Sequence, residues 1–116
     1  MNVLIRTDAS IEIGTGHVMR CVTLAKQLIR NGAAVTFICR NLEGNSIQYI
    51  QSQNLHVIEL PSTNKNCSKD DLQWIKNHWI IDAKETKEAI KNLKREIHLL
   101  IVDHYGIDIR WENELR

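Results

Sequence analysis

At 116 residues, the chain is long enough for one compact domain with a buried core and suits no more than one. Hydrophobic residues make up 43% and charged residues 25%, which is the ordinary composition of a soluble globular protein. The formal net charge of +1, without a polybasic strip, argues against a nucleic-acid partner and against a membrane-surface partner.

The cysteines are Cys21, Cys39 and Cys67, an odd number with no CxxC pair, so neither a disulfide framework nor a zinc site is predicted. Cys21 and Cys39 stand among apolar neighbours and are predicted to be small core residues. No apolar run approaches roughly 20 residues, and no signal-peptide core precedes the first strand. These features predict a reduced, cytoplasmic domain without a membrane span.

The first third of the chain predicts strand, helix and strand. Asn2–Arg6 is a short strand, and a glycine-bearing loop follows it to Gly16. A helix is predicted from about His17 to Asn31, because apolar residues recur there at i, i+3, i+4 and i+7. Gly32 stands where a left-handed cap ends a helix. Residues 34–39 are nearly all apolar, which is typical of a strand covered on both faces.

The middle of the chain predicts a helix, a strand and an exposed loop. The helix spans residues 44–53, and the strand spans residues 56–60 and is stopped by Pro61. Residues 62–71 are polar and predict the loop.

The last third predicts a helix, a strand and a further helix. Asp82 is a plausible N-cap with Glu85 three residues on, so a helix is expected from Asp82 to about Arg95. Residues 97–102 are expected to form the most buried and central strand, and residues 103–106 end it. A final helical segment is expected near Asp108.

Regular alternation of strand and helix predicts an α/β fold with a Rossmann-like parallel sheet and flanking helices. The expected strand order is 3-2-1-4, with the topological switch between the first and fourth strands. Ligands of such sheets bind outside the carboxyl ends of the strands at that switch. The loop 8–17 and the segment 103–106 are therefore expected to face each other across one crevice.

The loop after the first strand contains Gly14 and Gly16 and leads directly into a helix. Glycines allow a sharp turn and a close approach to a ligand, and a helix start offers free N–H groups to an anion. A dinucleotide site is not predicted, because Met19 replaces the third glycine of the motif and Arg40 stands where an acidic ribose partner is expected. A P-loop is absent, because no Gly-Lys-Ser/Thr follows.

His17 directly follows these glycines and is the candidate catalytic residue. The positive end of a helix disfavours imidazolium, so a neutral imidazole able to accept a proton from water is expected there. The alternative is a residue that only caps or packs the helix.

Asp103, His104 and Tyr105 at the exit of the fourth strand form the second candidate group. Asp103 is either functional or the cap of the next turn, and His104 is a second base, a ligand contact or a loop residue. Arg6 and Asp8 either flank the site or form a structural ion pair. The other histidines lack metal-ligand spacing, so no metal is predicted.

The tryptophans, Trp74, Trp79 and Trp111, are predicted to be packing residues. Trp74 and Trp79 lie before Asp82, where an exposed aromatic side chain could wall a sugar pocket.

Two motifs carry a family resemblance: Arg6-x-Asp8-Ala9-Ser10-x-x-Ile13-Gly14-x-Gly16-His17-x-x-Arg20 and Asp103-His104-Tyr105-Gly106-Ile107. They resemble the nucleotide-sugar hydrolases of the pseudaminic acid pathway and the related spore-coat polysaccharide biosynthesis proteins. The resemblance spans nearly the whole chain. It implies the amino-terminal lobe of a GT-B-like enzyme, in which water attacks the anomeric carbon of a UDP-sugar and releases UDP. His17 matches the catalytic histidine of the family, and neither a metal nor another cofactor is implied.

The leading hypothesis is therefore a nucleotide-sugar hydrolase lobe in surface polysaccharide or nonulosonic acid biosynthesis. The residues expected to bind or orient sugar and water are Arg6, Asp8, Gly14, Gly16, Arg20, Asp103, His104 and Tyr105. A glycosyltransferase on the same scaffold would use the same base on a sugar hydroxyl. A non-catalytic Rossmann-like binding module is the third interpretation.

The resemblance implies that the family's carboxy-terminal, nucleotide-binding lobe is not part of residues 1–116. Residues 1–116 are thus expected to be one lobe whose partner is the second lobe. The isolated lobe is expected to be inactive, with a face through which copies can self-associate.

Overall fold

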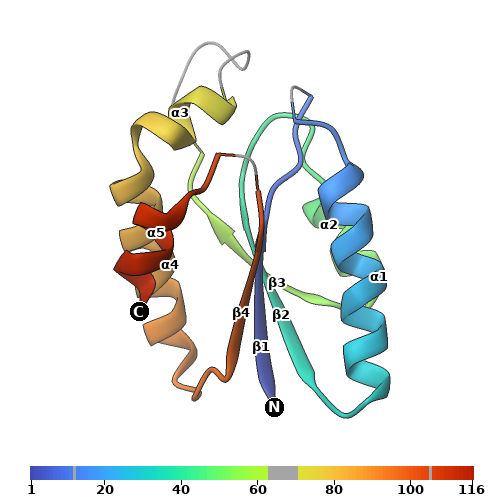
Figure 1. Ribbon diagram of the computed structural model, residues 1–116. Coiled ribbons are helices and arrows are strands. Elements are labelled where there is room, and N and C mark those ends of the chain that lie inside the picture. Colours follow the sequence, from blue (N-terminus) through green and yellow to red (C-terminus); the bar gives the residue numbers. More distant parts are fainter. Residues whose placement is uncertain (12, 63–70, 105) are drawn as a thin grey trace.

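The computed structural model describes residues 1–11, 13–62, 71–104 and 106–116. Strands and helices alternate along most of the chain (Figure 1), with the order β1 (Asn2–Thr7), α1 (Gly16–Arg30), β2 (Ala34–Arg40), α2 (Ile47–Ser52), β3 (His56–Leu60), α3 (Asp71–Asn77), α4 (Trp79–Leu93), β4 (Leu99–Asp103) and α5 (Ile109–Leu115). The strands form one parallel sheet in the order β3-β2-β1-β4. The predicted α/β class and strand order are confirmed.

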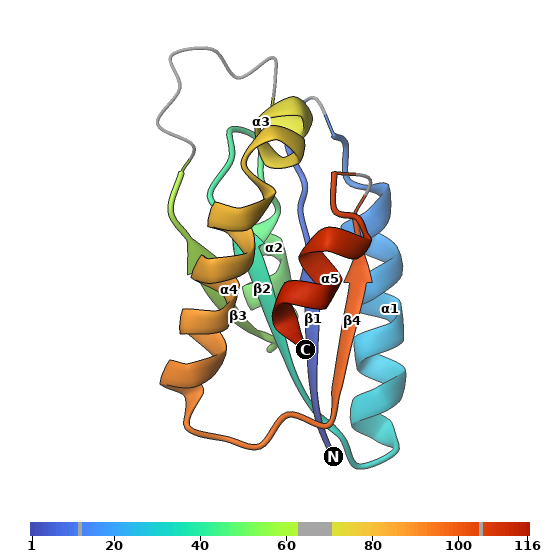
Figure 2. The ribbon, with the colours of Figure 1, turned by 60° about the vertical axis from the view of Figure 1, so that its left-hand side comes forward.

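Helices cover both faces of the sheet, α1 and α2 on one side and α4 with α5 on the other (Figures 1 and 2). Alternation along β1 explains the two layers, because successive side chains of a strand point to opposite faces. Val3 and Ile5 pack into the core with α1 and α2, whereas Leu4 packs into the core with α4. Arg6 follows on the same face as Leu4, so its side chain is directed toward α4.

The helix before β4 begins earlier than predicted, and the interpretation of Asp82 as its N-cap is wrong. Helix α4 starts at Trp79, and Asp82 lies within its first turn with a fully buried side chain. Its carboxylate accepts hydrogen bonds from other elements instead of from the amides of its own helix. The helix ends at Leu93, two residues before the predicted end, because Lys94 adopts a left-handed conformation with φ 55°.

Strand β4 is not the central, most buried strand that its apolar sequence predicts. Within the described residues it pairs only with β1, so it forms one edge of the sheet. Leu99 is 42% exposed, and the rest of β4 is half-buried. Burial of a strand depends on its neighbours as well as on its own hydrophobicity.

Shorter elements agree with the sequence in part. Helix α2 lies inside the predicted range 44–53 and begins at Ile47, where the Asn45 side chain accepts the Ile47 amide hydrogen at 3.0 Å. Helix α3 is not predicted from the sequence, and most of the predicted loop 62–71 lies outside the described residues. The last helix begins at Ile109, close to the predicted start near Asp108. The Asp108 side chain caps it by accepting the Arg110 amide hydrogen at 3.0 Å.

No helix in the described part of the chain is both long and apolar enough to span a membrane. Cys21 and Cys39 are buried free thiols, as predicted, and Cys67 lies outside the described residues.

The loop between β1 and α1 is held by its own backbone and by the loop after β2. The Gly14 amide donates to the Ser10 carbonyl at 2.8 Å, and Gly14 has φ 82°. The Ile11 amide donates to the Glu43 carbonyl at 3.0 Å. Gly44 permits this contact, because a Cβ atom there would lie 2.7 Å from Cγ1 of Ile11. The loop that leads into α1 and His17 is thus supported by the loop after β2.

Gly44→Ala should destabilise the fold by about 2–4 kcal/mol, more than Gly32→Ala, in denaturant unfolding. Both glycines have positive φ, 78° and 93°, so both substitutions incur a similar backbone strain of about 1 kcal/mol or more. Only Gly44 also faces a steric overlap, with Ile11, whereas a Cβ at Gly32 would meet nothing within 4 Å. Equal losses of unfolding free energy in the two variants would show that the overlap with Ile11 adds nothing to the backbone strain.

Candidate functional site

The site is centred on a histidine and a carboxylate from the first and last strand-loop units. His17 lies in the first turn of α1, and Asp103 is the last residue of β4. His17 Nδ1 lies 2.5 Å from Oδ1 of Asp103. The carboxyl ends of β1 and β4 are adjacent in the parallel sheet, and this adjacency brings together residues 86 positions apart. The start of α1 and the end of β4 therefore meet, as predicted from the strand order.

Two further side chains contact the Asp103 carboxylate, and a third bonds its backbone carbonyl. Arg20, one turn after His17, places Nη2 3.3 Å from Oδ2 of Asp103. The Cys21 thiol donates to Oδ2 at 3.7 Å, and the Thr7 hydroxyl donates to the Asp103 carbonyl at 3.0 Å. Burial by itself raises the pKa of Asp103, but His17 and Arg20 outweigh it and hold that pKa below its usual value. Asp103 is thus a carboxylate at neutral pH.

The thiol of Cys21 stays protonated in this setting. Burial, with the nearby Asp103 charge, raises its pKa to about 11. It therefore acts as a hydrogen-bond donor to the carboxylate and not as a thiolate nucleophile.

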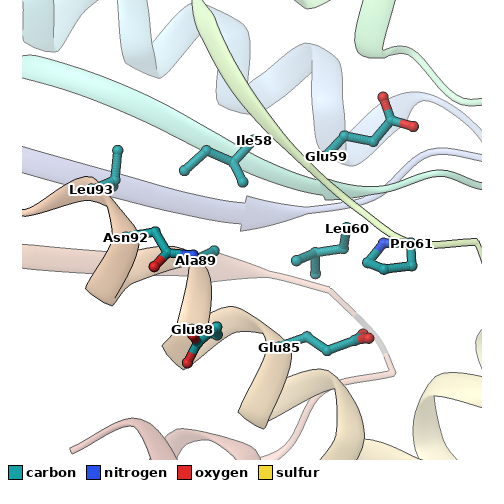
Figure 3. Close-up of a pocket in the computed structure, with 9 residues that line it drawn as sticks. All are labelled: Ile58, Glu59, Leu60, Pro61, Glu85, Glu88, Ala89, Asn92 and Leu93. Carbon is teal, nitrogen blue, oxygen red and sulfur yellow. The ribbon is translucent and has the colours of Figure 1, made fainter.

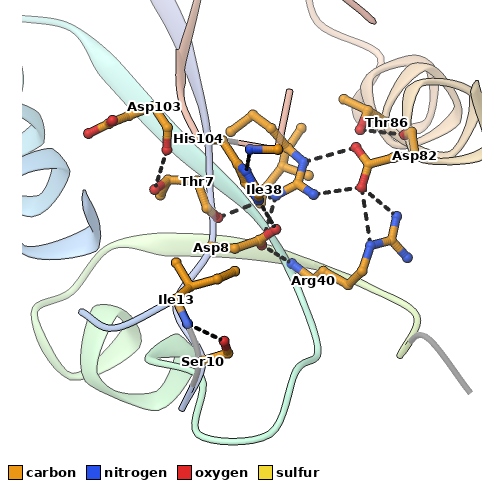
Figure 4. Close-up of polar contacts among 12 residues, drawn as sticks. Thr7, Asp8, Ser10, Ile13, Ile38, Arg40, Asp82, Thr86, Asp103 and His104 are labelled. Atoms are coloured by element: carbon orange, nitrogen blue, oxygen red, sulfur yellow. Dashed lines mark hydrogen bonds and ion pairs between the residues drawn. The ribbon is translucent and has the colours of Figure 1, made fainter. Parts of the chain in front are cut away.

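A second, buried cluster lies directly beside the first. Asp8 accepts from Arg6 Nη1 at 2.8 Å and from the backbone amide of Arg40 at 2.7 Å. Its other oxygen lies 2.8 Å from Nε2 of His104 (Figure 4). Burial raises the pKa of Asp8, but Arg6 and His104 outweigh it and bring that pKa well below its usual value.

Asp82 forms the other half of the buried cluster. Its single carboxylate accepts hydrogen bonds from Nη2 of Arg6 at 2.7 Å, from Nη2 of Arg40 at 2.8 Å and from the Trp111 indole at 2.8 Å. Figure 4 shows Arg40 and Asp82 facing each other between β2 and α4. Arg40 also pairs with Glu85 at 2.7 Å. The cluster therefore ties α4 and α5 to the carboxyl ends of β1 and β2.

The predicted site residues divide between the two clusters. His17, Arg20 and Asp103 meet at the carboxyl ends of β1 and β4, where the Arg20 side chain is 65% exposed and that of Asp103 is 27% exposed. Arg6, Asp8 and His104 have side chains at most 1% exposed and bond one another, which is the structural alternative weighed for Arg6 and Asp8. Tyr105 lies outside the described residues.

The two predicted glycines differ in what they do. Gly14 requires its positive φ of 82°, as expected for a sharp turn. At Gly16 a Cβ atom would meet nothing within 4 Å, so no protein atom in the described structure demands a glycine there.

Sequence reasoning missed Arg40, Asp82 and Glu85 as partners within one cluster. One signal of a buried charge was Arg40, which directly follows the apolar strand 34–39. The other was Asp82 on the stripe of α4 that also carries the buried residues Ala83 and Thr86. A buried charge needs a partner of opposite sign, so each signal pointed to the other.

The tryptophans pack within the fold. Trp111 is fully buried, as predicted. The Arg40 guanidinium lies 5.1 Å from the ring centroid of Trp74, and Arg110 lies at 5.1 Å from that of Trp79. Trp74 and Trp79 thus each stack with a cation.

A hollow in the described surface lies elsewhere, between β3 and α4 (Figure 3). It has a volume of about 500 Å³, with Ile58, Leu60, Ala89 and Leu93 among its lining residues. None of the predicted site residues lines it. Among the described residues, no group of His, Cys, Asp and Glu side chains could hold a metal ion.

Comparison with known proteins finds a similar protein over most of the chain. No protein-family model matches the chain. The chain is 34% identical over 110 residues, 94% of its length, to "UDP-2,4-diacetamido-2,4,6-trideoxy-beta-L-altropyranose hydrolase" of Campylobacter jejuni. It spans about 30% of the length of that relative. Nearly the whole chain is therefore similar to a part of a UDP-sugar hydrolase.

Proposed function

We propose that this chain is one lobe of a nucleotide-sugar hydrolase, in which His17 takes a proton from the water that attacks the anomeric carbon. The observation that carries the proposal is the His17–Asp103 pair at the carboxyl ends of β1 and β4. This is the place where α/β sheets bind their ligands. The similarity to a UDP-sugar hydrolase supports the choice of substrate class.

The proposed step breaks one bond and forms one bond at the anomeric carbon. Water loses a proton to the His17 imidazole, and its oxygen forms the new bond to carbon. The bond from that carbon to the diphosphate oxygen breaks, and UDP leaves with the electron pair. A base placed in this way contributes about 10²–10⁴-fold to a rate.

The surrounding groups suit the binding of an anionic sugar substrate. Arg20 provides an exposed cation beside the base. The open space at Gly16 leaves room for a ligand to approach the start of α1. The first-turn amides of that helix are suited to negative charge, and Thr15 makes no side-chain hydrogen bond that caps them.

A sugar hydroxyl in place of water would make the same site a glycosyltransferase. The two functions differ in their products. Incubation of a two-lobed protein containing this chain with the UDP-sugar alone should release UDP and free sugar at equal rates. Turnover that requires an added sugar acceptor would identify a transferase instead.

The isolated chain should bind UDP only weakly, with a dissociation constant of about 1 mM or higher. In our proposal the second lobe holds most of the nucleotide, and binding of the remote nucleotide positions the reacting carbon. Calorimetric titration of residues 1–116 with UDP measures this directly, and the same sample should show negligible hydrolysis. Tight, stoichiometric binding would mean that this lobe holds the nucleotide and that the proposed division of labour is wrong.

A further inference from the structure

Two Asp–His pairs connect the loop after β1 with the loop after β4, in reciprocal fashion. His17 at the start of α1 pairs with Asp103 at the end of β4. Asp8 after β1 pairs with His104 after β4. The first pair uses Nδ1 of its histidine, at 2.5 Å, and the second uses Nε2, at 2.8 Å. The two rings therefore present opposite nitrogens to their carboxylates.

The tautomer of His104 follows from its two partners. The Gly106 backbone amide donates to Nδ1 of His104 at 2.9 Å, so Nδ1 carries a lone pair and no proton. The proton of the neutral ring is then on Nε2, which donates to Asp8. Both ring nitrogens of His104 are thus hydrogen-bonded within the protein, and its side chain is only 1% exposed.

The tautomer of His17 follows from a competition at Nδ1. Arg20 Nη2, which can only donate, lies 3.1 Å from Nδ1, and Oδ1 of Asp103 lies 2.5 Å from it. A bond to Arg20 needs a bare Nδ1, whereas a bond to the carboxylate needs a proton on Nδ1. The contact to Asp103 is shorter by 0.6 Å (3.1 − 2.5), and a charged acceptor makes the stronger bond. Arg20 keeps its own contacts to the carboxylate oxygens, at 3.4 and 3.3 Å.

We infer that Asp103 is a positioning residue that holds His17 with its proton on Nδ1, and that Nε2 is the atom that accepts the proton from water. His104 is held in the opposite tautomer and ties the end of β4 to Asp8, so it takes no part in proton transfer. The role of Nε2 rests on the proposed function, whereas the two tautomers do not. Asp103 also accepts two hydrogen bonds, from the Cys21 thiol at its carboxylate and from the Thr7 hydroxyl at its backbone carbonyl.

Two-bond proton–nitrogen correlation spectra of the ¹⁵N-labelled chain test the tautomers without any substrate. At a pH where the neutral rings predominate, His17 should show a protonated Nδ1 and an unprotonated Nε2. His104 should show a protonated Nε2 and a bare Nδ1. A protonated Nε2 on neutral His17, or a protonated Nδ1 on His104, would overturn the inference.

Asp103→Asn tests the positioning role, since an amide can bond either tautomer of His17. The spectrum of His17 should then become a mixture, with the His104 pattern unchanged. In a two-lobed protein containing this chain, kcat should fall about 10²–10⁴-fold with KM changed less than about threefold. Asp108→Asn, an exposed carboxylate that caps α5, is the matched control and should change neither the His17 spectrum nor kcat.

Two outcomes separate this inference from the proposed function. If His17 keeps its Nδ1 proton unchanged in Asp103→Asn, Asp103 does not set the tautomer and the inference fails. If the tautomers are as inferred but a two-lobed protein with His17→Asn still hydrolyses its substrate, the proposed function fails and the assignment of the two tautomers stands.

Discussion

Replacing His17 by Asn should lower kcat of a two-lobed protein containing this chain by about 10²–10⁴-fold, with substrate affinity changed little. Asn can occupy the space of the ring near Asp103 but cannot accept a proton at neutral pH. Loss of a group that acts only in the transition state lowers kcat and kcat/KM equally. Steady-state release of UDP, with substrate binding measured separately, gives both quantities.

His56→Asn is the matched control for this prediction, because His56 is an exposed histidine at the start of β3. It should leave kcat and substrate affinity unchanged. A large loss of binding in His17→Asn with kcat retained would make His17 a ligand contact and remove it as the base.

Asp82→Asn should destabilise the chain by about 3–5 kcal/mol, because it leaves two buried guanidinium groups short of one negative charge. Arg6 and Arg40 have side chains at most 1% exposed and both bond this carboxylate. A domain of this size has roughly 5–15 kcal/mol of stability, so the loss removes a large part of it. Urea unfolding of the wild-type and variant chains measures the difference.

Glu88→Gln is the control, since Glu88 is an exposed acid on the same helix, and its effect should stay within about 0.5 kcal/mol. An effect of Asp82→Asn below about 1 kcal/mol would show that the cluster contributes little to stability.

The difference between wild type and Asp82→Asn should also depend on pH. Burial raises the pKa of Asp82, but Arg6 and Arg40 outweigh it and lower that pKa in the folded state. A carboxylate with a lowered folded pKa stabilises the fold above its unfolded pKa, near 4, and loses this contribution as pH falls toward the folded pKa. The difference should therefore be largest near neutrality and narrow below about pH 4.

Local sequence patterns determined the layout of the fold and the place of the candidate base. The apolar stripe of residues 17–31 and the apolar strands 34–39 and 56–60 predicted α1, β2 and β3 nearly to the residue. Such patterns are readable because they repeat within one element and reflect which face is buried. Strand–helix alternation then led to the order β3-β2-β1-β4, and the order brought His17 and Asp103 together at the carboxyl ends of β1 and β4.

Only the tertiary structure decided which charged residues pair. Arg6 and Asp82 are 76 positions apart, and Arg40 and Asp82 are 42 apart, so no local spacing joins them. Without those partners, Asp82 has the sequence features of a helix cap, and Asp103 those of a ligand contact. The edge position of β4 was already part of the predicted strand order, and it explains why the strand is less buried than its apolar sequence alone predicts. The pairing of distant charges is a property of the assembled structure, which local sequence patterns do not contain.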